Sequence, residues 1–416
     1  MLTRRIFLRG SAIAMAGMGA VPSWLARAAS VEGKKRKILV AIFQRGAADG
    51  LNIVVPFAEK RYRELRPNLA IAPPSGQTSA SGLNIVGPNN GTTIDLDGRF
   101  ALNGAMQPLK ALWDKQQLAI VEATGSPDSS RSHFDAQDYM ESGTSGKTMG
   151  DGWLNRALPT AGAETSPLRA VAMGSQVPRT LRGERQAIAV GDSQQFNLGN
   201  QDAASILENM YATSADAQWG RTGKDAFEAM KLIQSINRSP YNPQGGAQYG
   251  PSGDLGRSLQ QLARLIKADA GIEAAFAEIG GWDHHGNENP QLSNVLRQFS
   301  GALAALCQDM GDRMEDIVLV TMSEFGRTAQ ENGNAGTDHG HGSFMLVLGG
   351  PVQGGKVYGK WPGLEKEQLF EGRDLAVTTD FRAVLGELIC GHLGQKDVGP
   401  VFPGFQPSDP LGLLRS

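Results

Sequence analysis

The sequence has little cysteine, few aromatic residues and no excess of either charge. Only Cys307 and Cys390 occur among 416 residues, which excludes a disulfide-rich scaffold and a thiolate metal site. The two thiols are either both free and buried or joined in a single bridge. The formal net charge is −2, so we expect no basic face and no nucleic-acid partner. These absences leave a large globular protein of one or two domains.

Beyond the N-terminal segment the sequence also lacks any apolar run long enough to cross a bilayer. Residues 1–28 carry the paired arginines Arg4 and Arg5, a short apolar run that contains glycine, and an Ala-Arg-Ala cleavage pattern. This combination is typical of a twin-arginine signal peptide. We therefore predict export to the periplasm by the twin-arginine translocase, which carries folded proteins, and no permanent membrane span. The mature chain, residues 29–416, is predicted to form one domain, with a helical cap or insertion around residues 203–277.

Short apolar runs without alternation recur along the chain, separated by helical patterns. The runs "ILVAIF", "LAIVE", "IVLVTMS" and "SFMLVLGG" have the character of strands covered on both faces, and "AAFAEI" is a weaker example. Helices are predicted at "SHFDAQDYMESG", "NVLRQFSGALAALCQDM" and "DFRAVLGELICGHLG". This order predicts an α/β fold, a three-layer sandwich around a mostly parallel sheet.

Polar side chains follow several of these strands, where ligands bind in such folds. Asp49 follows the first strand, Asp283 and His285 follow "AAFAEI", and Glu324 follows "IVLVTMS". Five of the six histidines, His133, His284, His285, His339 and His341, fall in three polar loops that also contain aspartate. Imidazoles with carboxylates suit a divalent metal ion, zinc first, with manganese, magnesium or calcium as alternatives. Either one ion or two ions fit this set of residues.

Two of these loops also contain candidates for holding an anion. Ser132 and Arg131 lie where a loop enters a helix, and exposed N–H groups at such a position attract phosphate or sulfate. Ser132 is the candidate nucleophile, with a plain helix cap as the alternative interpretation. Arg327, in "SEFGRT", is a second candidate for an anion contact. Within the "DHGHG" loop we expect His339 to bind metal, Asp338 to support it or form a turn, and His341 to be solvated. His284 is expected to face outward.

Several motifs together resemble the exported bacterial DUF1501 family. They are "FQRGAADGLNIVVP", "SRSHFDAQDYMESG", "GGWDHHGNE", "SEFGRTAQENGNAGTDHG", "GGKVYGKWPGL" and "TTDFRAVLGELICGHLG", and they span about residues 38–394. The family is similar to the alkaline phosphatase and sulfatase superfamily, whose members use metal ions to hydrolyse or transfer phosphate and sulfate esters. The resemblance implies an alkaline phosphatase-like fold.

The resemblance also assigns roles to individual positions. It implies metal ligands at Asp49, Asp283, His285, Glu324 and His339, and a nucleophile near Ser132. Two departures stand out. Phe325 occupies a position where the superfamily has a ligating histidine, and the spacing of "WDHH" would place Asn287 at another. One metal ion, or an oxygen-richer second site, therefore fits better than a two-zinc site.

These observations predict a periplasmic, metal-dependent hydrolase of phosphate or sulfate esters on a small molecule or a glycan. Asp49, Asp283, His285, Glu324 and His339 would hold metal, and Ser132, Arg131 and Arg327 would act on the ester. The alternative is an exported protein that keeps the hydrolase fold without catalysis and binds an anion, a glycan or a partner protein.

Overall fold

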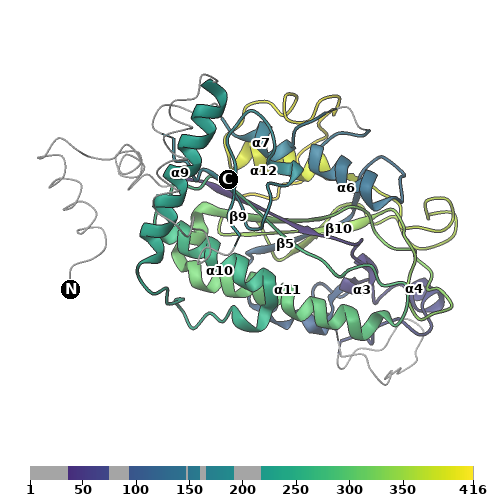
Figure 1. Cartoon of the computed structure of the whole chain (residues 1–416). Helices are drawn as coiled ribbons and strands as arrows, with labels where there is room; N and C mark the ends of the chain where they lie inside the picture. Colours follow the sequence, from purple (N-terminus) through teal and green to yellow (C-terminus); the bar gives the residue numbers. More distant parts are fainter. Residues whose placement is uncertain (1–35, 75–92, 147–148, 160–164, 192–216, 416) are drawn as a thin grey trace, which may run out of the picture.

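A computed structural model describes residues 36–74, 93–146, 149–159, 165–191 and 217–415 (Figure 1). Within these ranges nine strands form one sheet, in the order β11-β5-β10-β9-β1-β8-β6-β7, with β12 beside β5. The strands are β1 (Ile38–Gln44), β5 (Leu118–Gly125), β6 (Ala170–Ala172), β7 (Ile188–Ala189), β8 (Ala274–Ile279), β9 (Ile317–Ser323), β10 (Ser343–Gly349), β11 (Lys356–Tyr358) and β12 (Thr379–Asp380).

The sheet is mostly parallel, as the unalternating apolar runs predicted. β1 pairs in parallel with β8 and β9, and β6 pairs in parallel with β7 and β8. β10 runs antiparallel to both of its neighbours, β5 and β9. Because β10 is reversed, its first residue lies at the same edge of the sheet as the last residues of β5 and β9. Three loops therefore meet at that edge.

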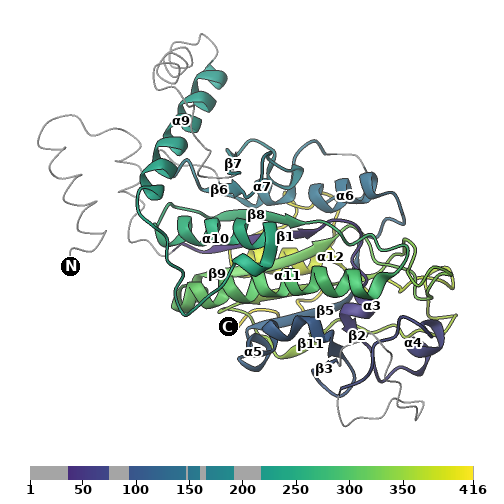
Figure 2. The ribbon, with the colours of Figure 1, turned by 60° about the horizontal axis from the view of Figure 1, so that its bottom comes forward.

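Helices cover both faces of the sheet and complete the predicted three layers (Figures 1 and 2). Along β1, Val40 and Ile42 pack into the apolar cluster under α10 (Gly253–Lys267) and α11 (Glu288–Met310). Phe43 packs on the other face of the sheet, with Leu39 and Ala41, against α7 (Trp153–Ala157) and α12 (Phe381–Gly391). Each such buried side chain stabilises the fold by about 1.5–3 kcal/mol. Both faces of β1 must therefore be apolar, which is why its sequence does not alternate.

Smaller elements complete the layers. They are α3 (Gly50–Ile53), α4 (Lys60–Leu65), α5 (Lys110–Asp114), α6 (His133–Ser142), a small sheet of β2 (Val54–Val55), β4 (Ala101–Leu102) and β3 (Ile94–Asp95), and the 3-10 helices η1 (Gly104–Leu109), η2 (Arg179–Leu181), η3 (Gly250–Ser252) and η4 (Gly311–Asp316). Two caps expected from the sequence are present. Ser132 caps α6 by accepting from the Asp135 N–H, and Asp380 caps α12 by accepting from the Arg382 N–H.

The structure describes residues 217–277 of the predicted cap or insertion. α10 packs on α11 and β8 within one helical layer, and α9 (Ala217–Asn237) packs its buried residues into the same apolar cluster. Residues 203–216 of the predicted cap and the predicted signal peptide lie outside the described residues.

Two expectations about thiols and membranes can be compared with the structure. Cys307 is buried and Cys390 half-buried, and both are free thiols, so the alternative of a single bridge is wrong. Among the described residues, no helix has the length and apolar character that a bilayer crossing requires.

Candidate metal centre

The sheet edge described above brings together side chains from three loops. The loop after β8 supplies Asp283 and His285, the loop before β10 supplies His339, and the loop after β5 enters α6 at His133. The backbones of Arg327 and His339 pair with each other as an isolated antiparallel bridge. Gly326 and Gly340 permit this pairing, because a Cβ on Gly326 would lie 1.9 Å from the Gly342 carbonyl oxygen and one on Gly340 2.3 Å from the Arg327 backbone. The glycines of "SEFGRT" and "DHGHG" thus fix where His339 lies.

His133, Asp283 and His339 can each offer one ligand atom such that all three atoms lie within 4.8 Å of one another. The Nε2 atoms of His133 and His339 are 3.0 Å apart. Asp283 Oδ1 is 3.2 Å from His339 Nε2, and Oδ2 is 3.4 Å from His133 Nε2. His285 joins them, since its Nε2 lies 2.9 Å from Asp283 Oδ1 and 3.1 Å from His339 Nε2. We call these four residues the histidine cluster.

Each histidine of the cluster donates through its outer ring nitrogen. The Nδ1 atom of His133 lies 2.9 Å from Glu324 Oε1, that of His339 2.9 Å from the Arg131 carbonyl oxygen, and that of His285 3.1 Å from Asp338 Oδ1. These three partners can only accept, so each Nδ1 carries a proton, and the neutral form of each ring has its lone pair on the inward Nε2. Metal-binding histidines are oriented in this way by their outer partners.

The inward-facing atoms fit a divalent cation. Lone pairs about 3 Å apart repel one another unless a proton or a cation lies between them. Zinc–nitrogen bonds of about 2.0–2.1 Å in a tetrahedron separate neighbouring ligand atoms by roughly 3.3 Å, close to the spacings of this cluster. The four side chains supply three imidazole nitrogens and one carboxylate, a donor set that suits zinc. Their 24–48% exposure leaves room for a solvent molecule or a substrate to reach the centre.

Charges around the cluster set the protonation of its nitrogens and its carboxylate. The hydrogen bond to Glu324 raises the pKa of His133, so its Nε2 is a stronger base toward either a proton or a cation. Burial lowers the pKa of His339, and the neighbouring His133 adds to this effect, so the neutral imidazole is favoured. Burial opposes the ionisation of Asp283, but the Arg327 guanidinium outweighs it and holds the pKa of Asp283 below its usual range.

Glu324, which we predicted as a ligand, lies one layer behind the cluster. Its Oε1 accepts from Gly46 N at 2.8 Å and from Gln137 Nε2 and His133 Nδ1, both at 2.9 Å. Its Oε2 accepts from Ser323 Oγ at 3.1 Å. With both oxygens engaged and 1% exposure, Glu324 orients His133 and turns no free oxygen toward the other cluster side chains.

Asp49, another predicted ligand, is held by an arginine. Arg66 approaches its two carboxylate oxygens at 2.5 and 2.8 Å, and both side chains are buried. Burial opposes the charged form of Asp49, yet the Arg66 guanidinium keeps its pKa below the usual range. The structure therefore does not bring Asp49 into the cluster, because this buried ion pair engages both of its oxygens.

Neither arginine predicted to hold an anion has its guanidinium open to one. Arg327 is 2% exposed and bonds Asp283 Oδ1 at 2.5 Å and Thr337 Oγ1 at 3.1 Å. Arg131 turns its guanidinium to Asp374 and Glu371, each at 2.7 Å. Arg327 fixes Asp283, and the Arg131 carbonyl oxygen accepts from His339. Both arginines hold side chains of the cluster in place.

Ser132 directly precedes His133 and caps α6. Its Oγ accepts a long hydrogen bond of 3.5 Å from the Asp135 N–H. The cap interpretation therefore describes its local structure. The role of nucleophile stays a prediction.

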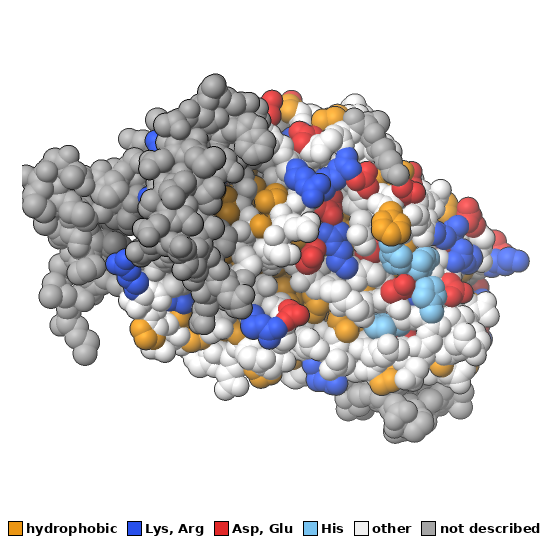
Figure 3. Space-filling view, viewed as in Figure 1, with side chains coloured by type: hydrophobic (Ala, Val, Ile, Leu, Met, Phe, Trp, Pro, Cys, Tyr) orange, Lys and Arg blue, Asp and Glu red, His pale blue; other side chains and the backbone are white. Residues whose placement is uncertain are grey.

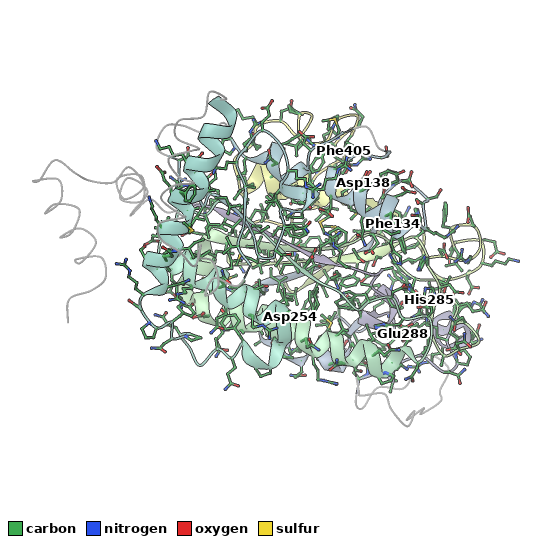
Figure 4. All side chains as sticks on the ribbon, in the orientation of Figure 1. Phe134, Asp138, Asp254, His285, Glu288 and Phe405 are labelled. Atoms are coloured by element: carbon green, nitrogen blue, oxygen red, sulfur yellow. The ribbon has the colours of Figure 1, made fainter. Side chains whose placement is uncertain are left out.

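Aromatic rings form the walls of the cluster. Phe325 packs its ring against His133 and His339, with centroids 5.0 and 5.1 Å away. Phe134, beside His133 on the first turn of α6, is 90% exposed, and within the described residues no other large apolar side chain is classed as exposed. Figure 3 shows the histidines as a pale-blue patch on the surface, and Figure 4 shows Phe134 and His285 on that side of the molecule.

Two expectations for the remaining histidines were wrong. His284 is 4% exposed and does not face outward. His341 is 8% exposed and stacks on Phe370 at 4.3 Å instead of being solvated. Asp338 supports His285 and not His339.

His133 was grouped with the other loop histidines but was not predicted as a ligand. Its place directly after the helix-capping Ser132, at the sheet edge, is the signal that points to it.

Comparison with known proteins places the chain in a family. The family model described as "Protein of unknown function (DUF1501)" matches residues 36–395. The chain belongs to this family. No curated protein matches it.

Among solved structures, the C-terminal periplasmic domain of EcEptC from Escherichia coli is similar at 10% identity and a TM-score of 0.38, covering 91% of this chain and 89% of that one. The PsFucS1 sulfatase from Pseudoalteromonas sp. gives 10% identity and a TM-score of 0.37, covering 95% and 78%. A mutant of TAB5 alkaline phosphatase gives 11% identity and 0.28, covering 76% and 91%. Similarities of this size carry no argument about activity.

Proposed function

We propose that this DUF1501 protein is an exported, metal-dependent hydrolase of phosphate or sulfate esters. The observation that supports it most is the histidine cluster, with three inward Nε2 atoms, one carboxylate and an accepting partner on each outer nitrogen. Sites of this kind that keep an access route serve catalysis more often than structure. The cluster's partial exposure provides that route.

Four residues would hold the ion: His133, Asp283, His285 and His339. A bound divalent ion supplies Lewis-acid polarisation of the ester oxygen and lowers the pKa of bound water. We propose one ion, because Phe325 packs against two of the ligands where a second site would need a histidine.

The surrounding residues would hold the ligands in place and bind the substrate. Arg327 fixes Asp283, and Glu324 fixes His133. Ser132, half-buried at the amino end of α6, has a hydroxyl with only one long local bond and is the proposed nucleophile or anion contact. The exposed ring of Phe134 would contact the organic part of the ester.

Turnover of 4-nitrophenyl phosphate and 4-nitrophenyl sulfate, with zinc, manganese, magnesium or calcium added in turn, tests the proposal. We expect hydrolysis of at least one ester, and its loss in Asp283→Asn. Asp254→Asn is the matched control, since Asp254 is exposed on α10 and bonds only its neighbour Arg257. Absence of turnover with every ion would refute the hydrolase proposal.

Non-catalytic binding is a second candidate, favoured by one observation. Both arginines that were expected to hold the anion are engaged in internal ion pairs. Metal binding without turnover, together with binding of an anion, a glycan or a partner protein, would support this second candidate.

A further inference from the structure

A cavity lies beside α6, the helix that begins with His133 of the histidine cluster. It has a volume of about 360 Å³ and is lined by α6, by the ends of β6 and β8, and by the segment around η2. Its wall includes Arg45, Gln137, Glu141, Arg179 and Arg182. We call it the α6–η2 pocket. Like the cluster, it opens beyond the carboxyl ends of parallel strands, where ligands bind in α/β sheets.

Gln137 connects the pocket to the cluster. Its Nε2 donates to Glu324 Oε1 at 2.9 Å, and Glu324 in turn orients His133. Its Oε1 accepts from Arg45 NH1 at 3.1 Å. Gln137 therefore forms part of the pocket wall and also bonds Glu324, the hydrogen-bond partner of His133. The pocket and the cluster therefore share one hydrogen-bond network.

The pocket wall is held in place by Glu141. Its Oε2 accepts from both Thr180 N and Thr180 Oγ1 at 2.9 Å, which ties η2 to α6. Its Oε1 pairs with Arg45 at 2.7 Å, and Arg45 stacks over the Phe43 ring at 4.0 Å. These contacts fix the backbone that presents the arginines of η2, so the pocket is preorganised.

Arg182 is the cation that these contacts leave available. Arg45 is paired with Glu141 and Glu278, and Arg179 with Asp138. Arg182 uses its Nε to donate to the Val177 carbonyl oxygen at 3.0 Å, and its two terminal nitrogens have no acceptor among the described residues. Burial lowers the pKa of Arg179, and the nearby positive charge of Arg182 lowers it further. Arg179 and Arg182 both line the pocket, and two guanidiniums on one wall favour an anion beside Arg182, the one without an ion pair among the described residues.

We infer that the α6–η2 pocket binds a second anionic group of the substrate, with Arg182 as the contact. The inference rests on the proposed function for the identity of the ligand as an ester. It narrows the substrate class to esters that carry a second phosphate, sulfate or carboxylate. Such a contact, remote from the reacting bond, lowers KM and leaves kcat unchanged when it binds substrate and transition state equally.

Calorimetric binding of glucose 1,6-bisphosphate and glucose 1-phosphate to the full chain tests the inference. Because a hydrogen bond to a charged group contributes about 1.5–3 kcal/mol, we expect the bisphosphate to bind roughly 10- to 100-fold more tightly. Arg182→Gln should abolish that preference, and Arg182→Lys should retain part of it. Arg185→Gln is the matched control, because Arg185 lies three positions along, pairs with Glu184 and does not line the pocket.

Equal affinity for the two sugars, or an equal effect of Arg182→Gln and Arg185→Gln, would overturn the inference. Phosphate release measured in parallel separates this outcome from failure of the proposed function. Tighter binding of the bisphosphate without hydrolysis would support the pocket and refute the hydrolase proposal. Hydrolysis with equal binding of the two sugars would support the hydrolase and refute the pocket.

Discussion

Replacing Glu324 with glutamine should weaken metal binding without unfolding the protein. Glutamine has nearly the same shape, and its single carbonyl oxygen can still accept from Gly46 N, Gln137 Nε2 and His133 Nδ1, which now lie 2.8–2.9 Å from Glu324 Oε1. Its amide nitrogen would face Ser323 Oγ, a hydroxyl that can accept a hydrogen bond. What disappears is the negative charge behind His133.

The size of the effect follows from that loss. The carboxylate raises the pKa of His133 and so makes Nε2 a stronger ligand. Removal of the outer partner of a ligating histidine typically costs 10- to 100-fold in metal affinity, or about 1.4–2.8 kcal/mol. We expect Glu324→Gln to fall in this range, with little change in the melting temperature of the metal-free protein.

The assay is competition for zinc between the protein and a coloured chelator of known affinity. Glu367→Gln is the control, because it removes the same charge at an exposed position. If Glu324→Gln binds zinc within about twofold of both the wild type and the control, His133 is not a ligand oriented by Glu324, and the proposed organisation of the centre is wrong.

Two further predictions concern stability and substrate contact. Asp309 is 0% exposed, accepts hydrogen bonds from Tyr241, Tyr249 and Gln244 N, and pairs with Lys267. Asp309→Asn should therefore lower the free energy of unfolding, measured in urea melts, by about 3–5 kcal/mol. Asp312→Asn, at an exposed position, is the control and should not have this effect. Burial opposes ionisation of Asp309, but its hydrogen bonds hold its pKa below the usual range. Its contribution is therefore present above about pH 4 and lost as pH falls through the lowered value, and Asp309→Asn should lack this part of the acid sensitivity. A stability difference that does not shrink in acid would contradict this assignment. Phe134→Ser should raise KM for aryl esters severalfold and leave bound metal unchanged, whereas an unchanged KM would show that the ring does not contact substrate.

The sequence predicted the layers of the fold well because the central strands are buried on both faces. Continuous apolar runs such as Ile38–Phe43 have no other stable place in a protein of this size. The signals of α6 and α12 were equally local, since the caps Ser132 and Asp380 lie next to the helices they begin. The helical cap or insertion around residues 203–277 stays a prediction, because a helical pattern does not reveal which surface a helix packs on.

The site was only partly predictable, because local sequence shows where polar residues lie but not their partners. Asp49 and Glu324 follow buried strands as ligands would, yet Asp49 meets Arg66, and Glu324 meets His133 from 191 positions away. Arg131 pairs with Asp374, 243 positions along the chain. Asp283, His285 and His339 converge because their loops leave the same sheet edge, which the strand order determines.

Metal analysis of the protein purified from the periplasm tests the central claim most directly. The account predicts about one equivalent of a divalent ion, zinc first, in the wild type, and its loss in the double variant His133→Ala plus His339→Ala. Retention of the ion in Asp254→Asn would exclude a general effect of substitution. Less than about a tenth of an equivalent of any divalent ion in the wild type, or an ion content that the double variant does not change, would contradict it.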